Sequence, residues 1–399
     1  SKNNWGRLGM KSEWKHSTIG EVCVKVTDGS HFSPKSVERG EYMVSVKDFT
    51  LYGFDFSSCR QISKEDYNKL AASGCVPEYE DILIGKDGAR YFEDVIVYRQ
   101  RERPALLSSI AILRCNKEKI LPEYLYYILK TPTFKKDVKD NYGSGSAIPR
   151  IILKDFKRMP IKYPGLDEQK RVVSILTLLD QKIALDNKIN ENLEQQAQAL
   201  YREMFLENQN ITTVTKTLNS IAVITMGQSP SGKSYNEDGV GEVFYQGRAE
   251  FGTRFPTRRL FTTEPKRMAE AGDVLLSVRA PVGDLNVAYE KCCIGRGLAA
   301  VHSKIGNNSF ILYTMMASKP RFDVFNGEGT VFGSINRESL NTMPIEVPPM
   351  EMIVKFEDMA HPIDEMIRIR YEENCRLETL RDTLLPKLMN GEIDIEDVI

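Results

Sequence analysis

The chain has 399 residues, of which 41% are hydrophobic and 27% are charged, and its net charge at pH 7 is −1. This length is too great for one ordinary hydrophobic core and predicts two or three domains. No apolar run approaches the ~18 residues that a membrane-spanning helix needs. The seven cysteines show neither metal nor redox spacing and are typical of reduced thiols. These features argue against a membrane protein or a disulfide-stabilised secreted protein and predict a cytoplasmic one.

Charge is distributed unevenly along the chain. Residues 1–166 carry a net charge of +7 and residues 206–348 carry +1, whereas residues 167–205 carry −2 and residues 349–399 carry −7. Basic segments that alternate with acidic ones indicate a DNA-binding footprint in a protein whose remainder has another task. The alternative is that the acidic segments are simply well solvated.

The first part of the chain is predicted to consist of short strands and loops. Runs rich in β-branched residues lie at 22–26, 82–84 and 110–113, bounded by Gly, Pro, Asp and Ser, and a helix is expected near 123–130. We therefore predict an α+β domain over residues 1–164, built on a twisted and partly barrelled sheet.

A long helix is predicted next, because residues 167–205 contain neither glycine nor proline. We assign residues 165–207 to this central helix. Its apolar positions alternate in steps of three and four over about four heptads, the pattern of a coiled coil. The predicted seam consists of Leu176, Leu179, Ile183, Leu193, Ala197, Leu200 and Met204.

The second half of the chain repeats this organisation. Strands are expected at 221–224, 274–276 and 299–301 and a helix near 309–317, within a second domain over residues 208–348. Residues 349–399 form the second predicted helix, which Pro362 and Pro386 are expected to kink or bound. Its seam consists of Ala360, Ile363, Ile367, Leu377, Arg381, Leu384 and Leu388.

The two halves are an internal repeat. Residues 144–164 match residues 328–348 at an offset of 184, with Met159-Pro160 falling on Met343-Pro344. Farther upstream the offset drifts to 192 and then to 199. The sequence therefore predicts two homologous domains that differ in loop length, joined to two equivalent helices in a pseudo-two-fold molecule.

Both predicted seams are interrupted by polar residues at the same place. Asp186 and Asn190 break the first, and Arg370 and Asn374 break the second. Because buried polar residues in a coiled coil fix register and partner, we expect antiparallel helices with Asp186 near Arg370. The alternative is that these residues lie hydrated at the edge of the seam.

One segment matches a nucleotide-binding pattern. Residues 227–234 satisfy GxxxxGK[ST], whose chemistry needs a helix N-terminus after the loop to hold phosphate. Here Ser234 is followed by Tyr-Asn-Glu-Asp-Gly-Val-Gly, which does not predict a helix. No HExxH, G-x-S-x-G or methyltransferase motif is present either. A binding protein is therefore favoured over an enzyme, and the alternatives are a nucleotide-binding or nuclease enzyme acting through 227–234 and a coiled-coil scaffold without DNA function.

Several motifs in this order resemble the DNA-specificity subunit of type I restriction-modification enzymes. The resemblance covers the whole chain, although residues 350–352 (Met-Glu-Met) depart from the family-like Asp167-Glu168-Gln169 of the first copy. The motifs that carry it are residues 19–22, 28–34, 143–150, 160–161, 167–173, 227–230, 272–275 and 383–393.

The resemblance implies a function in phage defence. Each globular domain would be a target-recognition domain that reads one half of a bipartite sequence in double-stranded DNA. The paired helices would set the gap between the halves and dock two methyltransferase subunits, with restriction subunits joining the complex. The chain would then be non-catalytic and hold no cofactor or metal, because S-adenosylmethionine, ATP and magnesium would bind to the partner subunits.

Candidate DNA contacts are basic, amide and hydroxyl side chains in loops, because such groups bond to phosphates and base edges. Loops without a counterpart in the other copy, such as 251–259, are expected to read bases. In the first domain the candidates are His31, Ser33, Lys35, Lys47, Lys86, Arg90, Tyr91, Tyr142, Ser144 and Ser146. In the second they are Ser229, Ser231, Lys233, Tyr235, Gln246, Arg248, Arg254, Arg258, Arg259, Arg279 and Ser334.

Overall fold

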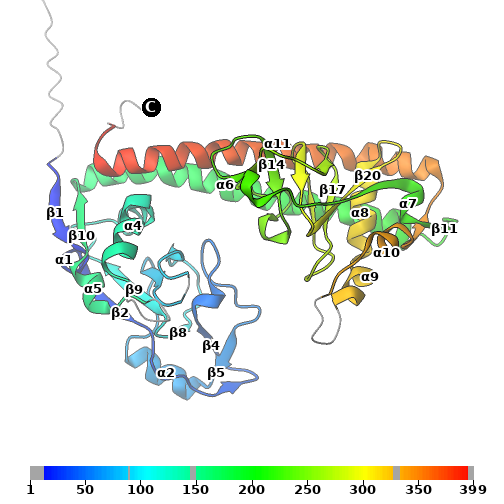
Figure 1. The fold of residues 1–399 in the computed structure, drawn as a ribbon. Helices are drawn as coiled ribbons and strands as arrows, with labels where there is room; N and C mark the ends of the chain where they lie inside the picture. The colour runs from blue at the N-terminus through cyan, green and yellow to red at the C-terminus, as the bar shows by residue number, and fades with distance from the viewer. Residues whose placement is uncertain (1–12, 89, 144–149, 327–332, 394–399) are drawn as a thin grey trace, which may run out of the picture. The chain divides into compact units, whose positions relative to one another are not determined.

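A computed structural model describes residues 13–88, 90–143, 150–326 and 333–393. The chain forms two compact units (Figure 1), and each unit includes parts of both long helices. Unit 1 consists of residues 1–183 and 376–399, and unit 2 consists of residues 184–375. The long helices are α6 (Leu166–Tyr201), which ends in a short π-helix η2 (Arg202–Leu206), and α11 (Met350–Asn390).

The centre of unit 1 is an antiparallel sheet of four strands in the order β2-β9-β6-β7. These strands are Cys23–Asp28, Ile110–Cys115, Ile82–Gly85 and Val95–Val97. A second sheet has the order β3-β5-β4-β8, formed by Ser36–Val37, Arg60–Ile62, Glu41–Val44 and Ala105–Leu106. Strand β1 (Lys15–Thr18) pairs with β10 (Pro160–Tyr163). The helices are α1 (Ile19–Val22), η1 (Val46–Asp48), α2 (Lys64–Ala72), α3 (Pro122–Lys130), α4 (Pro132–Asn141) and α5 (Leu153–Arg158).

Unit 2 repeats this topology. Its central sheet has the order β12-β20-β17-β18, formed by Ala222–Met226, Leu298–Ser303, Val274–Ser277 and Leu285–Val287. The second sheet, β13-β15-β14-β19-β16, consists of Tyr235–Asn236, Phe261–Thr262, Glu242–Tyr245, Cys292–Ile294 and Met268–Ala269. Strand β11 (Val214–Thr217) pairs with β21 (Pro344–Val347). The helices are α7 (Leu218–Ile221), η3 (Gly232–Ser234), η4 (Arg248–Glu250), α8 (Asn308–Ala317), α9 (Lys319–Asp323), η5 (Val324–Asn326) and α10 (Arg337–Asn341).

The predicted strands and helices are confirmed, except that Val22 and Ile221 end the short helices α1 and α7 and that α11 ends at Asn390. Strands β2, β6 and β9 and helix α3 occupy the predicted runs of the first copy, and β12, β17, β20 and α8 occupy those of the second. Strands β6 and β9 are buried almost throughout, which is why they read as continuous apolar runs. The α+β prediction with an internal repeat is therefore confirmed.

Each hydrophobic core joins a central sheet to the ends of both long helices. In unit 1, Leu176 of α6 and Leu388 of α11 pack with the sheet and with Tyr124 of α3. In unit 2, Ala197 of α6 and Phe356 of α11 occupy the corresponding core. Burial at this scale contributes about 25 cal/mol per Å² of apolar surface, so the helix segments are integral to both units.

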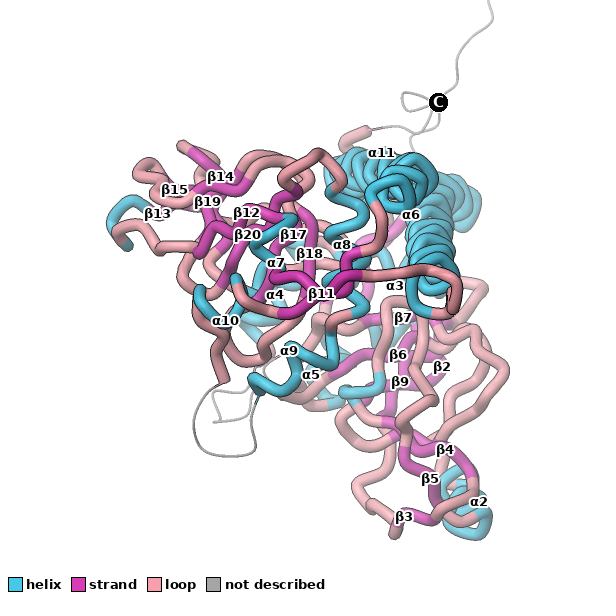
Figure 2. The backbone as a smooth tube through the Cα atoms, turned by 90° about the vertical axis from the view of Figure 1, so that its right-hand side faces the viewer, coloured by secondary structure: helices cyan, strands magenta, loops and turns pink. Residues whose placement is uncertain are grey.

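The helix segments pack antiparallel, as predicted. In unit 2, Arg370 Nη1 donates to Asp186 Oδ1 at 2.9 Å, and Asn190 Nδ2 donates to the Ile367 carbonyl at 3.3 Å. Increasing numbers on α6 therefore meet decreasing numbers on α11, and both views show the helices side by side (Figures 1 and 2). Asp186 is fully buried, so the polar break is part of the seam and not a hydrated edge.

The prediction for the two prolines was wrong in part, because α11 continues through both. A proline inside a helix removes one backbone hydrogen bond and crowds the preceding turn. Around Pro362 the helix is held by Ala360 and Ile363 in the core of unit 2, and around Pro386 by Leu385 and Leu388 in the core of unit 1. Core packing on both sides of each proline offsets the lost bond.

Candidate nucleic-acid interface

The loop after β2, residues 29–35 in unit 1 (called the early loop below; its counterpart in unit 2 is 227–234), is fixed against β8 at the end of the second sheet. Ser30 N donates to the Leu106 carbonyl at 2.7 Å. A Cβ at Gly29 would lie 2.3 Å from the same oxygen, so only glycine permits this approach. The anchored loop presents three predicted contacts, His31, Ser33 and Lys35, to solvent.

Arg150 and Ile151, which follow the undescribed stretch 144–149, lie beside the end of β6. Ile151 N donates to the Lys86 carbonyl at 3.0 Å, and Asp87 forms an isolated bridge with Arg150. A Cβ at Gly143 would lie 2.7 Å from Tyr91 Oη, which places Tyr91 beside the residue that precedes this stretch. The neighbouring Tyr142 is partly buried. The predicted contacts Ser144 and Ser146 lie outside the described residues.

Lys86 is not available to DNA, and this part of the prediction is corrected. Its side chain is only 7% exposed and pairs with Asp28 at 3.4 Å and with Asp87 at 3.5 Å. The two carboxylates compensate a buried ammonium, which could reach a phosphate only by breaking both pairs. Lys86 therefore ties the early loop to the sheet edge.

Two further predicted residues of unit 1 are exposed beside this edge. Lys47 lies on η1, where Ser45 N donates to Asp48 Oδ2 at 2.7 Å and so fixes the turn. Arg90 is 78% exposed and pairs with Asp94 at 3.0 Å. An exposed pair of this kind contributes little to stability, so Arg90 can exchange its partner for a phosphate.

In unit 2 three glycines bring backbone segments into close contact at the equivalent edge. A Cβ at Gly227 would lie 2.1 Å from the Gly295 carbonyl oxygen, and one at Gly295 or Gly297 within 3 Å of the Gln246 carbonyl oxygen. Gln246 is exposed here. Ser229 Oγ accepts a hydrogen bond from Arg296 N at 3.2 Å. Because Gly295 and Gly297 on either side of Arg296 lie against Gln246, the candidate residues Ser229 and Gln246 lie near each other.

In unit 2, Gly333 and Ser334, which follow the undescribed stretch 327–332, lie beside the end of β17. Arg279 forms an isolated bridge with Ser334, and Ala280 N donates to the Gly333 carbonyl at 2.9 Å. Val278 N donates to the Gly297 carbonyl at 2.9 Å, which joins this pair to the glycine-crowded edge. The exposed Arg279 and Ser334 therefore lie where Asp87 and Arg150 lie in unit 1.

Arg248 lies on η4, the counterpart of η1, and its side chain forms an ion pair with Asp284. Partial burial raises the pKa of Asp284, but Arg248 and Lys319 outweigh that effect and hold the pKa below its usual range. Lys319 Nζ lies 3.4 Å from Asp284 Oδ1. The carboxylate therefore stays ionised and orients Arg248 beside the edge.

Residues 227–234 do not form a phosphate-binding loop. The segment ends in the single 3-10 turn η3, and strand β13 follows where a helix would have to begin. Ser234 is buried, with its Oγ 2.7 Å from Thr262 Oγ1. The nucleotide-binding alternative therefore lacks its structural requirement, a helix N-terminus directed at the phosphates. Ser231 and Lys233 are exposed, and Tyr235 Oη donates to the Pro230 carbonyl at 3.1 Å.

The basic run of loop 251–259 divides into two groups. Arg258 and Arg259 are more than half exposed and pair with Glu290 and Glu250 respectively. Arg254 is only 8% exposed and forms an ion pair with Asp364 of α11. Its prediction as a DNA contact was wrong, because the guanidinium points into the unit and not to solvent.

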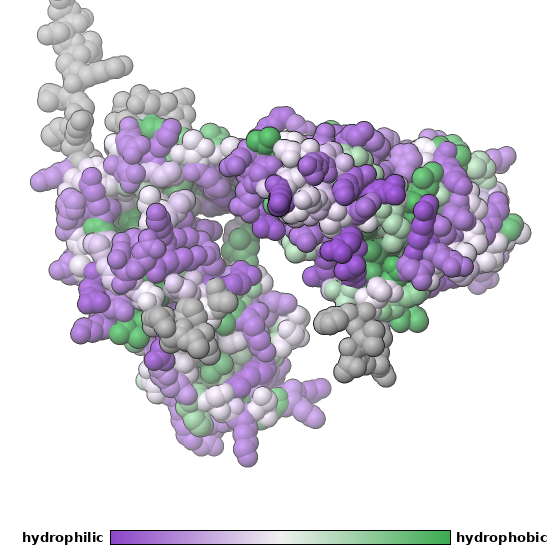
Figure 3. Space-filling view, viewed as in Figure 1, coloured by the Kyte–Doolittle hydropathy of each residue, from purple (hydrophilic) through white to green (hydrophobic). Residues whose placement is uncertain are grey.

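The structure adds two basic residues that the sequence reasoning missed. Arg296 and Arg150 are exposed and lie on the edges described above. Arg296 stands in the run Gly295-Arg296-Gly297, between β19 and β20. An arginine between two glycines at a strand junction is a signal that could have identified it. Figure 3 shows mostly hydrophilic side chains over the β14 region of unit 2.

Two negative observations complete the description of the site. Within residues 13–393, leaving out the three undescribed internal stretches, no three His, Cys, Asp or Glu side chains are grouped to hold a metal ion. No helix among the described residues is long and apolar enough to cross a membrane.

Comparison with known families decides the class of protein. The sequence model of the type I restriction modification DNA specificity domain matches residues 11–195 and again residues 210–376. The chain belongs to this family. It is a type I restriction-modification specificity subunit with two target-recognition domains, and we call the globular part of unit 1 domain 1 and that of unit 2 domain 2.

Individual relatives agree with this assignment. The chain is 32% identical to the MjaX specificity subunit of a type I restriction enzyme from Methanocaldococcus jannaschii, over 72% of each chain. It is 24% identical to the HindI specificity subunit from Haemophilus influenzae, covering 96% of this chain and all of that one. The crystal structure of a type I specificity subunit from M. genitalium shares the fold, with a TM-score of 0.57 at 15% identity over 96% and 98% of the two chains.

Proposed function

We propose that domains 1 and 2 each read one half of a bipartite sequence in double-stranded DNA. The observation that carries this proposal is the repetition of one arrangement. In both units the early loop and the residues that follow the undescribed stretch 144–149 or 327–332 lie where strand ends of the central and second sheets meet, beside a short helical turn that bears an exposed basic residue. Two equivalent edges on one chain fit a target with two halves.

The chemistry of the edge in unit 2 suits base readout. Arginine pairs with guanine and glutamine with adenine in the major groove, and Arg279, Arg296 and Gln246 are exposed there. The glycines beneath them allow the backbone to approach a groove closely. The edge of unit 1 carries His31, Lys35 and other residues in place of these, which suits two different half-sequences.

The long helices have the opposite character, which supports docking of protein partners. Residues 349–399 carry a net charge of −7, which would repel DNA. Apolar side chains are nevertheless exposed on the helix segments, among them Leu178 and Leu185 on α6 and Met366 and Ile369 on α11. Exposed apolar side chains of this kind offer area that a protein partner would bury. We infer that the helices set the gap between the two half-sequences and dock two methyltransferase subunits, to which restriction subunits are added.

Within such a complex this chain would be non-catalytic. S-adenosylmethionine would be bound by the methyltransferase subunits, and ATP with magnesium by the restriction subunits. The residues that carry the proposal are loop side chains suited to base and phosphate contacts, not a set of acids, bases or nucleophiles arranged around a reacting group.

The test is methylation of random-sequence DNA by this chain together with its methyltransferase subunit. We expect one bipartite motif, read by sequencing of the methylated adenines. Arg279→Ala should relax base preference in one half only, by about tenfold or more, since a good bidentate base contact is worth about 1–3 kcal/mol. Methylation without a two-part motif would contradict the proposal.

Lys216→Ala is the matched control. Lys216 is an exposed cation of the same unit, but it lies on β11, before α7 and therefore at the far end of β12 from Gly227. It should leave the motif and the affinity unchanged. Equal losses from Lys216→Ala and Arg279→Ala would show that the edge has no special part in DNA binding.

A further inference from the structure

A tyrosine and an aspartate join each recognition domain to a long helix. In unit 1, Tyr127 Oη of α3 donates to Asp180 Oδ2 of α6 at 2.8 Å. In unit 2, Tyr313 Oη of α8 donates to Asp364 Oδ1 of α11 at 2.7 Å. These pairs occupy equivalent positions of the repeat, so both units use the same hydrogen bond to attach the domain to a long helix.

The arginine that completes each group comes from a different part of the chain. In unit 1, Arg381 of α11 donates to Asp180 at 2.9 Å, so this ion pair connects helix to helix. In unit 2 the position equivalent to Arg381 is Ala197, which is fully buried and has no charge. Arg254, from a loop of domain 2, takes over the role by pairing with Asp364.

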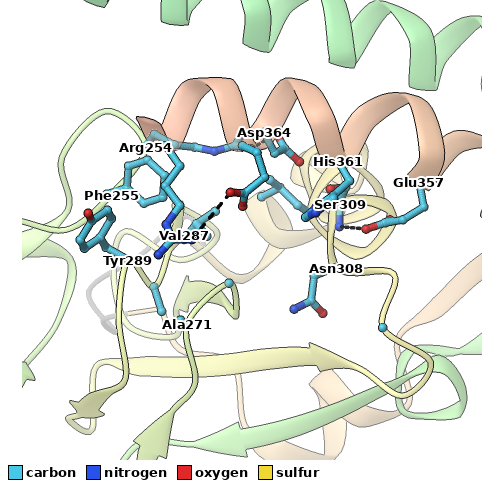
Figure 4. Close-up of a pocket in the computed structure, with 16 residues that line it drawn as sticks. Arg254, Phe255, Ala271, Val287, Tyr289, Asn308, Ser309, Glu357, His361 and Asp364 are labelled. Atoms are coloured by element: carbon cyan, nitrogen blue, oxygen red, sulfur yellow. Dashed lines mark hydrogen bonds and ion pairs between the residues drawn. The ribbon is translucent and has the colours of Figure 1, made fainter. Parts of the chain in front are cut away.

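Arg254 is held by three groups of unit 2, of which Figure 4 shows Asp364. The first is Asp364, with which Arg254 forms an ion pair. The second is Glu194 of α6, which lies 3.6 Å from Nη1 of Arg254, and the third is Tyr313, whose ring centroid lies 5.7 Å from the guanidinium. Burial by itself lowers the pKa of Arg254, but Asp364 and Tyr313 outweigh it and raise the pKa. One side chain of domain 2 therefore contacts both long helices as a cation.

The loop that carries Arg254 is fixed on both sides of this residue, at Gly252 and at Phe255. Gly252 N donates to Asn286 Oδ1 at 3.2 Å, and Asn286 Nδ2 donates to the Gly252 carbonyl at 3.0 Å. The next residue, Phe255, packs against Tyr371 of α11 with ring centroids 4.7 Å apart. A cavity of about 220 Å³ lies beside these residues, so apolar packing is not continuous here. The ion pair of Arg254 and the aromatic contact of Phe255 therefore attach this part of domain 2 to the helices.

We propose that Arg254 is a positioning residue that fixes domain 2 on the long helices and thereby determines which gap lengths between the two half-sequences the protein accepts. The proposal rests on the bipartite readout proposed above. Movement of domain 2 on its own helix segments would shift its DNA-reading edge along the duplex without changing the side chains that read bases. Arg254 should therefore control spacing, while Arg279 and its neighbours control sequence.

The experiment uses the complex of the full chain with its methyltransferase subunit. The substrates are duplexes that carry both half-sequences with the native gap or with a gap one base pair shorter or longer. We expect the ratio of methylation rates between native and altered gaps to fall about tenfold in Arg254→Met, which corresponds to ~1.4 kcal/mol. Base preference within each half should be unchanged, and Arg254→Lys, which keeps a cation near Asp364, should restore part of the ratio.

Two further variants separate positioning from general stability. Asp364→Asn removes the acceptor charge on the helix and should loosen the gap in the same way. Lys216→Ala, at an exposed cation of the same unit on β11, should leave the gap ratio unchanged. Proportional loss on all three duplexes with Arg254→Met and Asp364→Asn would mean a structural role alone and would overturn the proposal. A bipartite motif with unchanged gap preference would refute the role of Arg254 only, whereas absence of a bipartite motif would refute the proposed function.

Discussion

The ion pair between Asp186 and Arg370 gives a quantitative test of the helix pairing in unit 2. Asp186 is fully buried, Arg370 is 28% exposed, and their closest atoms lie 2.9 Å apart. Removing one partner of a buried pair costs about 3–5 kcal/mol because the other charge remains desolvated. Since Arg370 is partly exposed, we expect Arg370→Met to cost ~3 kcal/mol. At about 2–4 °C per kcal/mol for a unit of this size, Tm should fall by roughly 6–12 °C.

The pairing itself is measured by a double-mutant cycle. Asp186→Asn should cost less, about 1–2 kcal/mol, because the partly exposed guanidinium can be hydrated. In the double variant the buried carboxylate is gone, so the total loss should be smaller than the sum by about 1–2 kcal/mol. Urea unfolding followed by circular dichroism at 222 nm gives each free energy.

The control for this cycle is Asp167→Asn on α6. Asp167 is 93% exposed and its pair with Lys170 is 3.4 Å long, so its loss should be within the range of exposed pairs, about 0–1 kcal/mol. Additive losses for Asp186→Asn and Arg370→Met, with coupling below ~0.5 kcal/mol, would refute the inference that this pair fixes the helix register.

Two other predictions concern the DNA-reading edge and its neighbours. The pKa of Asp284 is lowered in the folded protein, so its stabilising contribution is present above the unfolded pKa of about 3.9 and is lost as pH falls through the folded value. The Tm difference between wild type and Asp284→Asn should therefore be constant from pH 8 to pH 5 and shrink below about pH 4; a difference that grows with acid would contradict the ion pair. Lys233→Ala should not alter ATP binding by the isolated chain in calorimetry, because no helix follows the 227–234 loop. Measurable ATP binding that this substitution abolished would reverse that conclusion.

Much of the architecture follows from local pattern. The absence of glycine and proline in 167–205 and the steps of three and four predict α6. The constant offset of 184 predicts that both helices follow equivalent domains. Matching of the polar breaks then predicts which residues meet, since a buried aspartate in an apolar seam needs a partner. These features depend on residues that are neighbours in sequence or on a repeated register, so they can be predicted from the sequence alone.

The functional assignment of individual basic residues could not be predicted in the same way. Lys86 and Arg254 have the same loop context in the sequence as Lys47 and Arg258, yet the first two are buried in ion pairs and the others are exposed. The run Gly295-Arg296-Gly297 marks a strand junction, but where Arg296 lies depends on Gly227 and Gln246, which are distant in sequence. Whether an arginine meets DNA or a carboxylate depends on what the fold brings within about 4 Å of it.

The sequence by itself thus determined the repeated domains, the two helices and their polar register, because periodicity and duplication are properties of the linear chain. The tertiary structure decided which side chains form each edge and that Asp364 is neutralised from domain 2 while Asp180 is neutralised from a helix. The physical reason is that a charge is placed by long-range packing, since the loop carrying Arg254 contacts α11 through residues far apart in the sequence.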